Sequence, residues 1–511
     1  MRNGSAVVIW SLALATSLLG AAFIFDTEPG ISWPIWVAAA SLSVLAARLA
    51  SVKRVEAPLA ILLGWATLLS LRFALHTSDL NAFVVLSDAM LLGLAVITIG
   101  APAWGELSAK LLAVVPILAP FRVWRATAQQ VADTPRSVHS QRSRSLIRGA
   151  LFSAPLVILL FVLLGNADPV IRWATDHIAA WLPDWSFPPR MLFFLFLLSL
   201  TPGANAIAAR QLEPALPNLP RFRTTSFIGV TEQRMVLWSA AVVLWLFVLL
   251  QLSYLIQPPP AAINSGVTFA EFARKGFGEL SIAVTIVGAI ILILEYARPV
   301  DASERDRKLL TRLELALVLA LELILLSAFR RVVLYEQAFG FTTDRVFAQT
   351  YMLVMALALL ALAFEIVRGS ISVNFARRVA VIALGAFTVL AFWNHEAWIV
   401  NKNIDRGIQT GKFDLAYARR LPDAIPTLIN RRRELGPVAA DIEAAVRCGK
   451  ESRTRRWFEW NRGANELDEA LRSVHPAACP SGESLRWIPR ADRSLETTTP
   501  TSAASVGTPA S

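Results

Sequence analysis

Long apolar runs separated by short charged segments dominate the chain. Each run holds about 20 residues with few charges, the length at which a helix rising about 1.5 Å per residue crosses a hydrocarbon core about 30 Å thick. The pattern therefore predicts an all-α, polytopic transmembrane bundle of about eleven spans. The expected spans are residues 5–25, 31–50, 57–74, 80–100, 146–165, 190–208, 235–256, 276–296, 308–329, 346–367 and 378–400.

The first run is longer than the apolar core of a secretory signal, which holds about 7 to 15 residues, and it leads directly into a second run. We therefore expect residues 5–25 to be a retained span. This interpretation places the N-terminus of the chain at one face of the membrane.

Basic residues in alternate loops predict the orientation of the bundle. Arg48, Lys53 and Arg54 follow the second run, whereas Asp26 and Glu28 follow the first. Basic loops remain in the cytoplasm, so we expect a cytoplasmic N-terminus and, with an odd number of spans, an extracytoplasmic C-terminus. The bias has two exceptions in expected outer loops, at 274–275 and 330–331.

Composition agrees with a membrane protein that has basic inner loops. Hydrophobic residues make up 55% of the chain and charged residues 17%, and the net charge is +11. Because this charge lies between spans, it indicates membrane orientation and contact with anionic lipid heads, and not nucleic-acid binding. The expected partner is the lipid bilayer, the sequence leaves any protein partner unknown, and the expected location is a bacterial inner membrane.

Five regions follow from these patterns. Residues 101–145 should form a cytoplasmic interfacial helix and a basic loop, because apolar positions recur at helical spacing until Pro116 and Pro120 interrupt them. A polar, mostly helical tail should follow the last span. The expected regions are 1–100 (four spans), 101–145, 146–400 (a seven-span core), 401–494 (the extracytoplasmic tail) and 495–511 (a disordered C-terminus).

The two cysteines, Cys448 and Cys479, both lie in the expected tail. An extracytoplasmic compartment preserves disulfides, so we expect a bridge that closes a loop of about 30 residues and stabilises the tail by about 3 to 4 kcal/mol. Neighbouring His or Cys residues that would complete a tetrahedral metal site are missing from the local sequence.

Common catalytic and cofactor motifs are absent from the sequence. Residues 406–413 superficially resemble a phosphate-binding loop, but Arg406 replaces the first glycine and Phe413 replaces the Ser or Thr that ligates Mg²⁺. We therefore predict no catalytic residues, no metal and no cofactor.

Charged residues inside the expected spans are candidate functional groups, because a charge at bilayer depth costs about 2.5 to 3.5 kcal/mol. Arg72 and Asp88 lie on consecutive spans and can pair across a hairpin, either as a structural ion pair or as part of a pathway. Glu314 and Glu322 are eight residues apart on one helix and can face one groove. Glu322 can relay protons or be a packed structural carboxyl.

Several short blocks resemble the bacterial multi-spanning family catalogued as domain of unknown function 4173. The blocks are ADPV at 167–170, TFAEFARKGFGEL at 268–280, RVVLYEQAFGFT at 331–342, WN at 393–394 with Asn401, Asn403 and Arg406, and DLAY at 414–417. The resemblance covers about residues 146–427 and implies a membrane region without an established activity. Phe269, Phe272 and Phe339 stand where such relatives carry tyrosine.

The resemblance points to an outer polar cluster, which can be a binding site or a salt-bridged lid that joins helix ends. Its members are Glu271, Arg274, Glu279, Arg331, Tyr335, Glu336, Asn401, Asn403 and Arg406.

Three functions remain open at this stage. A transporter or channel-like protein of unknown substrate would use the intramembrane charges. A non-catalytic scaffold or sensor would use the tail. An outer-face enzyme on lipid-linked substrates would need a carboxylate and a basic pair, for example Glu271 with Arg274 and Arg331.

Overall fold

The computed structural model describes residues 3–78, 80–99, 109–133, 187–209, 229–256, 269–296, 302–369, 375–436, 438–439, 442 and 455–474. In these ranges every regular element is a helix, as the hydrophobic pattern predicts. The long helices are α1 (Asn3–Phe23), α2 (Ser32–Val52), α3 (Ala57–Ser70), α5 (Asn81–Thr98), α6 (Ala109–Asp133), α9 (Phe187–Ala209), α10 (Val230–Ile256), α12 (Phe269–Tyr296), α13 (Glu304–Phe339), α14 (Thr343–Arg368), α15 (Phe375–Phe392) and α16 (His395–Thr410). The shorter elements are α4 (Arg72–Leu75), α17 (Leu415–Ala418), η2 (Pro422–Ala424), α18 (Ile425–Arg431), η3 (Arg432–Leu435), η4 (Trp457–Glu459) and α20 (Arg462–Arg472).

Seven helices of the described part are long and apolar enough to cross a membrane. They are Ala6–Phe23, Ser32–Val52, Ala57–Leu75, Pro189–Ala209, Val230–Leu250, Thr343–Arg368 and Phe375–Phe392. The chain is therefore an integral, multi-pass membrane protein.

Four expected spans are not among these seven. The runs 80–100 and 276–296 correspond to α5 and α12, whose apolar parts are shorter, Asn81–Val96 and Leu280–Glu295. The run 308–329 lies inside α13, a helix of 36 residues that carries many charges. The run 146–165 lies outside the described residues.

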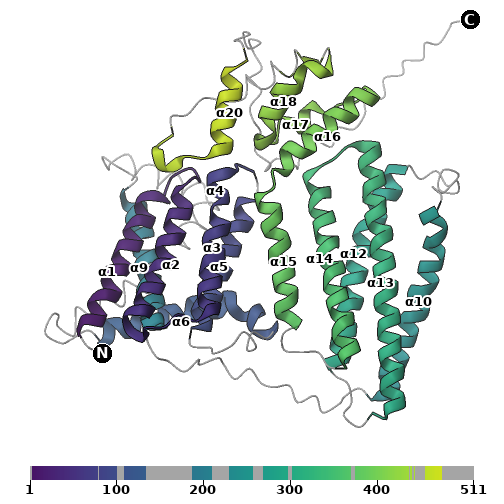
Figure 1. Cartoon of the computed structure of the whole chain (residues 1–511), viewed down its shortest axis with the longest axis horizontal. Helices are drawn as coiled ribbons and strands as arrows, with labels where there is room; N and C mark the ends of the chain where they lie inside the picture. Colours follow the sequence, from purple (N-terminus) through teal and green to yellow (C-terminus); the bar gives the residue numbers. More distant parts are fainter. Residues whose placement is uncertain are drawn as a thin grey trace, which may run out of the picture.

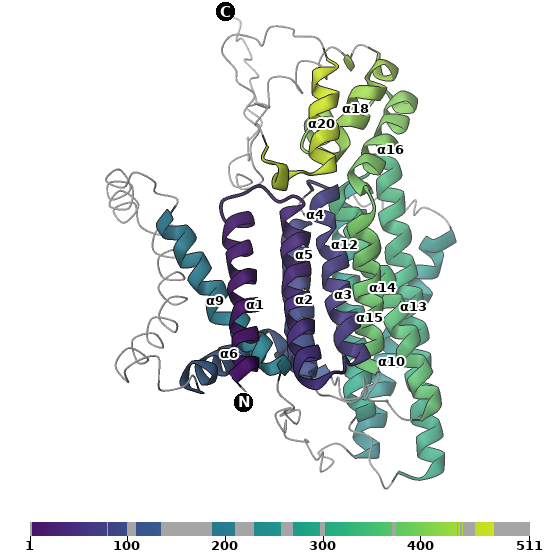
Figure 2. The same cartoon turned by 60° about the vertical axis from the view of Figure 1, so that its left-hand side comes forward.

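The long helices form two groups that stand side by side, with a polar cap above them (Figure 1). The N-terminal half contains α1 to α6 and α9, and the C-terminal half contains α10 and α12 to α15. The cap consists of α16 to α20. The start of α1 and the cap lie at opposite ends of the bundle (Figures 1 and 2).

Each of the three parts has its own hydrophobic core. The N-terminal half packs around Val37, Leu63 and Val84. The C-terminal half packs around a separate group that includes Leu317 and Leu321. A third cluster fills the cap and reaches Leu80, Val346 and Leu390 of the bundle. Its fully buried members are Ile399, Val400, Ile404, Ala424, Leu428 and Ile442.

Helix α15 lies between the two halves. It packs against α14 on one side, where Arg378 forms an ion pair with the fully buried Glu365. On the other side, Trp65 of α3 donates a hydrogen bond from Nε1 to Thr388 Oγ1 at 2.9 Å. Helix α15 thus connects two separately packed bundles.

The expected regional boundaries differ from the packing in three places. Helix α6 continues through Pro116 and Pro120, which were expected to end it, and lies across the lower end of the N-terminal half (Figure 2). Helix α9, expected in the seven-span core, packs against α1, α2 and α6. The cap begins at His395, because Asn394 accepts a hydrogen bond from Ala397 N at 3.0 Å and starts a new helix.

Glu365→Ala should lower the free energy of unfolding by about 3 kcal/mol, because it leaves the Arg378 guanidinium without its buried anionic partner. Thermal unfolding of the purified protein in detergent measures the effect. The matched control is Glu304→Ala, which removes an exposed pair with Lys308 that contributes about 0.5 kcal/mol or less. Equal effects of the two substitutions would contradict the role of the buried pair.

Candidate functional site

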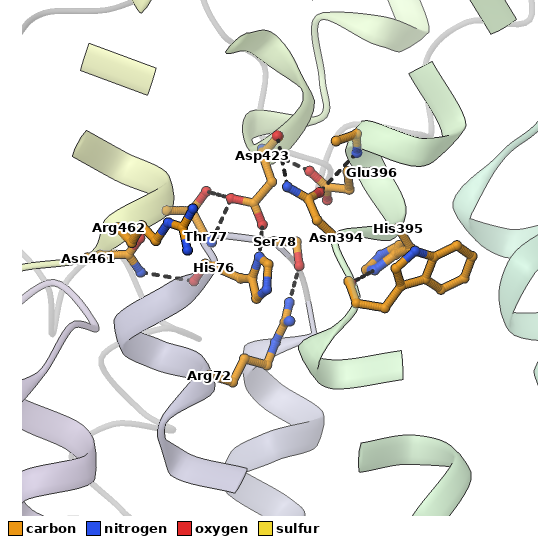
Figure 3. Close-up of polar contacts among 12 residues, drawn as sticks. Arg72, His76, Thr77, Ser78, Asn394, His395, Glu396, Asp423, Asn461 and Arg462 are labelled. Carbon is orange, nitrogen blue, oxygen red and sulfur yellow. Dashed lines mark hydrogen bonds and ion pairs between the residues drawn. The ribbon is translucent and has the colours of Figure 1, made fainter. Parts of the chain in front are cut away.

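Polar side chains of the N-terminal half and the cap converge where the cap meets the bundle, beside the end of α15 (Figure 3). We call this group the junction cluster. Its members are Arg72, His76, Thr77, Ser78, Asn394, His395, Glu396, Asp423 and Asn461.

Asp423, in η2 of the cap, is the centre of the cluster and is only 6% exposed. Its Oδ1 accepts hydrogen bonds from Thr77 N at 2.8 Å and from Thr77 Oγ1 at 2.6 Å. Its Oδ2 lies 3.3 Å from His76 Nδ1. Its backbone N donates to Glu396 Oε2 at 3.0 Å. One cap residue thus binds the loop after α4 and the start of α16.

Asp423 is a carboxylate at neutral pH. Burial acts to raise the pKa of this carboxyl, but hydrogen bonds from His76 and Thr77 favour the charged form and outweigh burial. The pKa therefore lies below its ordinary value, and the junction holds a permanent buried anion.

His76 lies against this carboxylate. Its Nδ1 faces the Asp423 carboxylate, and its Nε2 lies 3.4 Å from the Phe392 carbonyl at the end of α15. The ring of His76 therefore joins the N-terminal half, α15 and the cap.

Arg72 is fully buried and closes the same region from below. Its guanidinium donates to the Ala391 carbonyl of α15 and to Ser78 Oγ. The carboxylates of Asp423 and Glu396 supply opposite charge nearby. Arg72 therefore reinforces the connection between α4 and α15.

Asn461 attaches the last helix of the cap to the same place. Its Nδ2 donates to the carbonyls of Phe73 at 2.7 Å and His76 at 2.9 Å, while its Oδ1 accepts from Ala464 N and caps α20. A Cβ on Gly463 would lie 2.7 Å from Asp423 Oδ1, so only glycine allows this approach. Helix α20 is held directly against the junction.

Arg72 and Asp88 do not form the expected ion pair. The hydrogen bonds of Arg72 go to Ala391 and Ser78, at the upper end of the bundle. Asp88 is 2% exposed and accepts a hydrogen bond from Trp33 Nε1 at 3.3 Å. The two residues lie on consecutive expected spans, but each binds a different partner.

Glu314 and Glu322 have different surroundings. Glu314 is 1% exposed. Glu322 is half-buried, and Leu319 and Leu326, three and four residues away on the same helix face, are more than half exposed. Glu322 therefore lies at the edge of an outward face, and one of its oxygens, Oε1, is buried without a hydrogen-bond partner among the described residues.

The described members of the expected outer polar cluster mostly hold helix ends together. Asn403 accepts from Phe341 N at 2.7 Å and donates to Phe341 O at 2.9 Å. Arg406 donates to the Gln337 carbonyl at 3.1 Å and to the Ala338 carbonyl. These bonds attach α16 to the end of α13.

The other members of that cluster are dispersed. Glu336 accepts from Gln349 Nε2 at 2.8 Å, and the Tyr335 ring lies 4.2 Å from the Arg345 guanidinium carbon. Asn401 Oδ1 accepts from Arg431 at 3.1 Å, and Arg331 is half-buried. The side chains of Glu271, Arg274 and Glu279, and both cysteines, lie outside what the structure describes.

Sequence reasoning missed His76, Asp423 and Asn461. One available signal was the scarcity of histidine: the chain has five, and two of them, His76 and His395, lie close to expected upper helix ends. The described residues contain no group of three or more His, Cys, Asp or Glu side chains suited to a metal ion.

His395→Phe should remove part of the acid sensitivity of the fold. Burial lowers the pKa of His395 from 6.5 to about 4, so between these pH values the unfolded chain binds a proton that the folded chain does not. The neutral imidazole thus costs up to about 3 kcal/mol of stability as pH falls through this window. Unfolding temperatures at pH 7.5 and 4.5 should differ less in the variant than in the unchanged protein.

Phe347, whose ring centre lies 5.6 Å from that of His395, provides the matched control. Phe347→Leu should lower the unfolding temperature about equally at both pH values, because it changes packing without changing titration. An unchanged pH dependence in His395→Phe would show that His395 is not the acid-sensitive group.

Comparison with known proteins corrects the resemblance drawn from short blocks. The family model described as "Domain of unknown function (DUF4153)" matches residues 59–430, more than two thirds of the chain. The assignment to family 4173 was wrong, because a few short blocks at helix ends do not distinguish one multi-spanning family from another. No curated protein and no solved structure matches the chain.

The match begins in α3 and ends in α18, so it includes Arg72, His76 and Asp423 but not α20. The three cores and the junction between them, with the exception of the last cap helix, are therefore built largely from the matched region. The chain belongs to the DUF4153 family, whose domain has no known function.

Proposed function

We propose that this protein is a non-catalytic scaffold or sensor of a bacterial inner membrane, in which the cap holds the two helix halves in one relative arrangement. The observation that carries the proposal is the position of Asp423: a single cap carboxylate bound by His76 and Thr77 and linked through its backbone to Glu396. A partner that binds the cap and moves Asp423 would change the relation between the halves.

The separate cores of the two halves support this function. Each half buries its own apolar surface, so a change in their relative position does not require either core to open. The described connections between the halves run through α15 and the cap. A small displacement of the cap therefore acts at the connection and not on the folding of either bundle.

The buried charge of Asp423 favours two distinct states of the junction. Removing His76 from Asp423 leaves a buried carboxylate without one of its hydrogen-bond partners, and an unsatisfied buried charge costs several kcal/mol unless water enters. The junction is therefore either closed and paired or open and hydrated. This two-state character is what a sensor needs.

The proposed orientation places the N-terminus in the cytoplasm and the cap outside. Lys53, Arg54 and Arg305 lie at the ends of helices opposite the cap, as expected for basic loops that remain in the cytoplasm (Figure 1). The same loops can contact anionic lipid heads.

Asp423→Ala should broaden the distance distribution between the halves. Spin labels on Arg54→Cys and Arg305→Cys, both exposed at the end opposite the cap, report this distance in a background with Cys448→Ser and Cys479→Ser. Pulsed electron-electron spin resonance in lipid nanodiscs measures it. We expect one narrow distance in the unchanged junction and a broader or shifted distribution in the variant.

Asp405→Ala is the matched control, because Asp405 pairs with Arg431 inside the cap and does not reach the bundle. It should leave the distance distribution unchanged. If Asp423→Ala also leaves it unchanged while the cap remains folded, the cap does not hold the halves together and the proposal fails.

A transporter or channel of unknown substrate is the second candidate function. The observation in its favour is Glu322, a carboxylate in the middle of α13 with one buried oxygen that lacks a hydrogen-bond partner among the described residues. Such a group either packs as a neutral acid or lines water. Its position beside exposed Leu319 and Leu326 weakens this candidate relative to the scaffold or sensor.

Glu322→Cys should discriminate between these candidates in the same cysteine-free background. A transport pathway predicts reaction with a membrane-impermeant maleimide in sealed vesicles, because water must reach the side chain. Leu321→Cys, at a fully buried neighbouring position, should not react. Protection of Glu322→Cys from both sides of the membrane would exclude the aqueous pathway at this position.

A further inference from the structure

The short segment that leads into α20 exposes large aromatic side chains where the cap meets the membrane bundle. We call residues 455–460 the aromatic segment. Trp457 is 67% exposed and Trp460 is 43% exposed, although both belong to a well-packed part of the cap. Exposed tryptophans are costly in water and are typical of the boundary between lipid and water.

The aromatic segment lies on the upper ends of α1 and α2 (Figures 1 and 2, yellow). The ring of Phe23 lies 5.6 Å from that of Trp457 and 5.2 Å from that of Phe458, measured between ring centres. Phe23 is the last residue of a candidate span, Ala6–Phe23. The tryptophans are therefore at the level where the hydrocarbon core ends.

The backbone of the aromatic segment is firmly attached. Ile31 N donates to the Trp460 carbonyl at 2.9 Å, and a Cβ on Gly30 would lie 2.5 Å from the Glu459 carbonyl carbon. Arg455 forms ion pairs with Glu28 and Asp468. The exposed rings are thus presented from a fixed position.

A basic side chain lies beside these rings. Arg456 is exposed, and its guanidinium carbon lies 5.7 Å from the centre of the Phe458 ring. Arginine binds phosphate oxygens with two parallel donors, and a lipid phosphate lies just outside the level of interfacial tryptophans. The segment therefore combines apolar rings with a phosphate-binding group at the matching depth.

We propose that the aromatic segment is a lipid-docking surface: Trp457 and Trp460 enter the headgroup region of the cap-side leaflet, and Arg456 binds a lipid phosphate. The occupant is lipid because the rings of Trp457 and Phe458 pack on Phe23, at the end of a candidate membrane span. This proposal does not depend on the scaffold or sensor function.

Docking would also position the junction cluster. The aromatic segment continues directly into Asn461, which binds the carbonyls of Phe73 and His76. A cap anchored on lipid at Trp457 therefore has little freedom to move at Asn461. Lipid composition or thickness at this leaflet would act on the same contacts that join the cap to the bundle.

A fluorescent label at position 457 tests the proposal in the full chain. Trp457→Cys, with Cys448→Ser and Cys479→Ser, is labelled and reconstituted into phosphatidylcholine vesicles that contain lipid with a nitroxide on its headgroup. The control is Glu469→Cys, an exposed position on α20. We expect the headgroup nitroxide to quench the label at 457 at least about threefold more strongly than the label at 469.

The second half of the test uses iodide, a quencher that stays in water. Strong quenching by iodide at both positions, with no lipid quenching at 457, would overturn the proposal and leave the segment free for a protein partner. Trp460→Cys provides a second reporter if the first variant does not fold. Arg456→Gln should reduce lipid quenching at 457, since it removes the phosphate contact while leaving Phe458 and Trp460 in place.

Discussion

The buried carboxylate of Asp423 fixes how the cap sits on the bundle. A charge with 6% exposure is stable only where donors satisfy it, and three of its donors come from His76 and Thr77, far away in sequence. The carboxylate therefore cannot be buried unless α4 and the cap are in register. Apolar packing is non-directional, whereas these hydrogen bonds require one relative position of cap and bundle.

Buried polar groups also need hydrogen-bond partners at the ends of the helices. The last carbonyls of a helix have no partner within it, and at the edge of a membrane water reaches them poorly. The cap and its surroundings supply the donors: Arg72 binds the Ala391 carbonyl, Asn461 binds that of Phe73, and Arg406 binds that of Ala338. At the opposite end, Arg48 donates to the Ala208 carbonyl at 3.2 Å. Helix-end chemistry explains why Arg72 and Arg48 are buried.

The sequence predicted most of the helices but not the hydrogen-bond partners of the buried polar side chains. Hydrophobic runs predicted most long helices because each must match the thickness of the membrane. The pattern failed at Pro116 and Pro120, since a proline removes one backbone hydrogen bond and need not end a helix that packs on its neighbours. It also failed to place Glu322 on the outward edge of α13, because the helix is apolar on more than one face.

The partners of Arg72 show why sequence alone could not predict these contacts. A charge in a span suggests a countercharge, and Asp88 on the next expected span was the predicted partner. The observed acceptors are a backbone carbonyl, 319 residues away, and a serine. Every residue has a carbonyl, so no sequence pattern marks the one that will be used. Asp423 and Asn461 were missed for the same reason: their partners include backbone groups at helix ends.

Polar bonds between separately packed bundles have a dynamic consequence. Apolar contacts weaken gradually as surfaces separate, whereas a buried ion pair with fixed hydrogen bonds is lost over a short displacement and is replaced by water. The halves should therefore interconvert between distinct arrangements and not deform continuously. Because α15 carries both Arg378, paired with Glu365, and the carbonyls bound by Arg72 and His76, any such change must be transmitted along this helix.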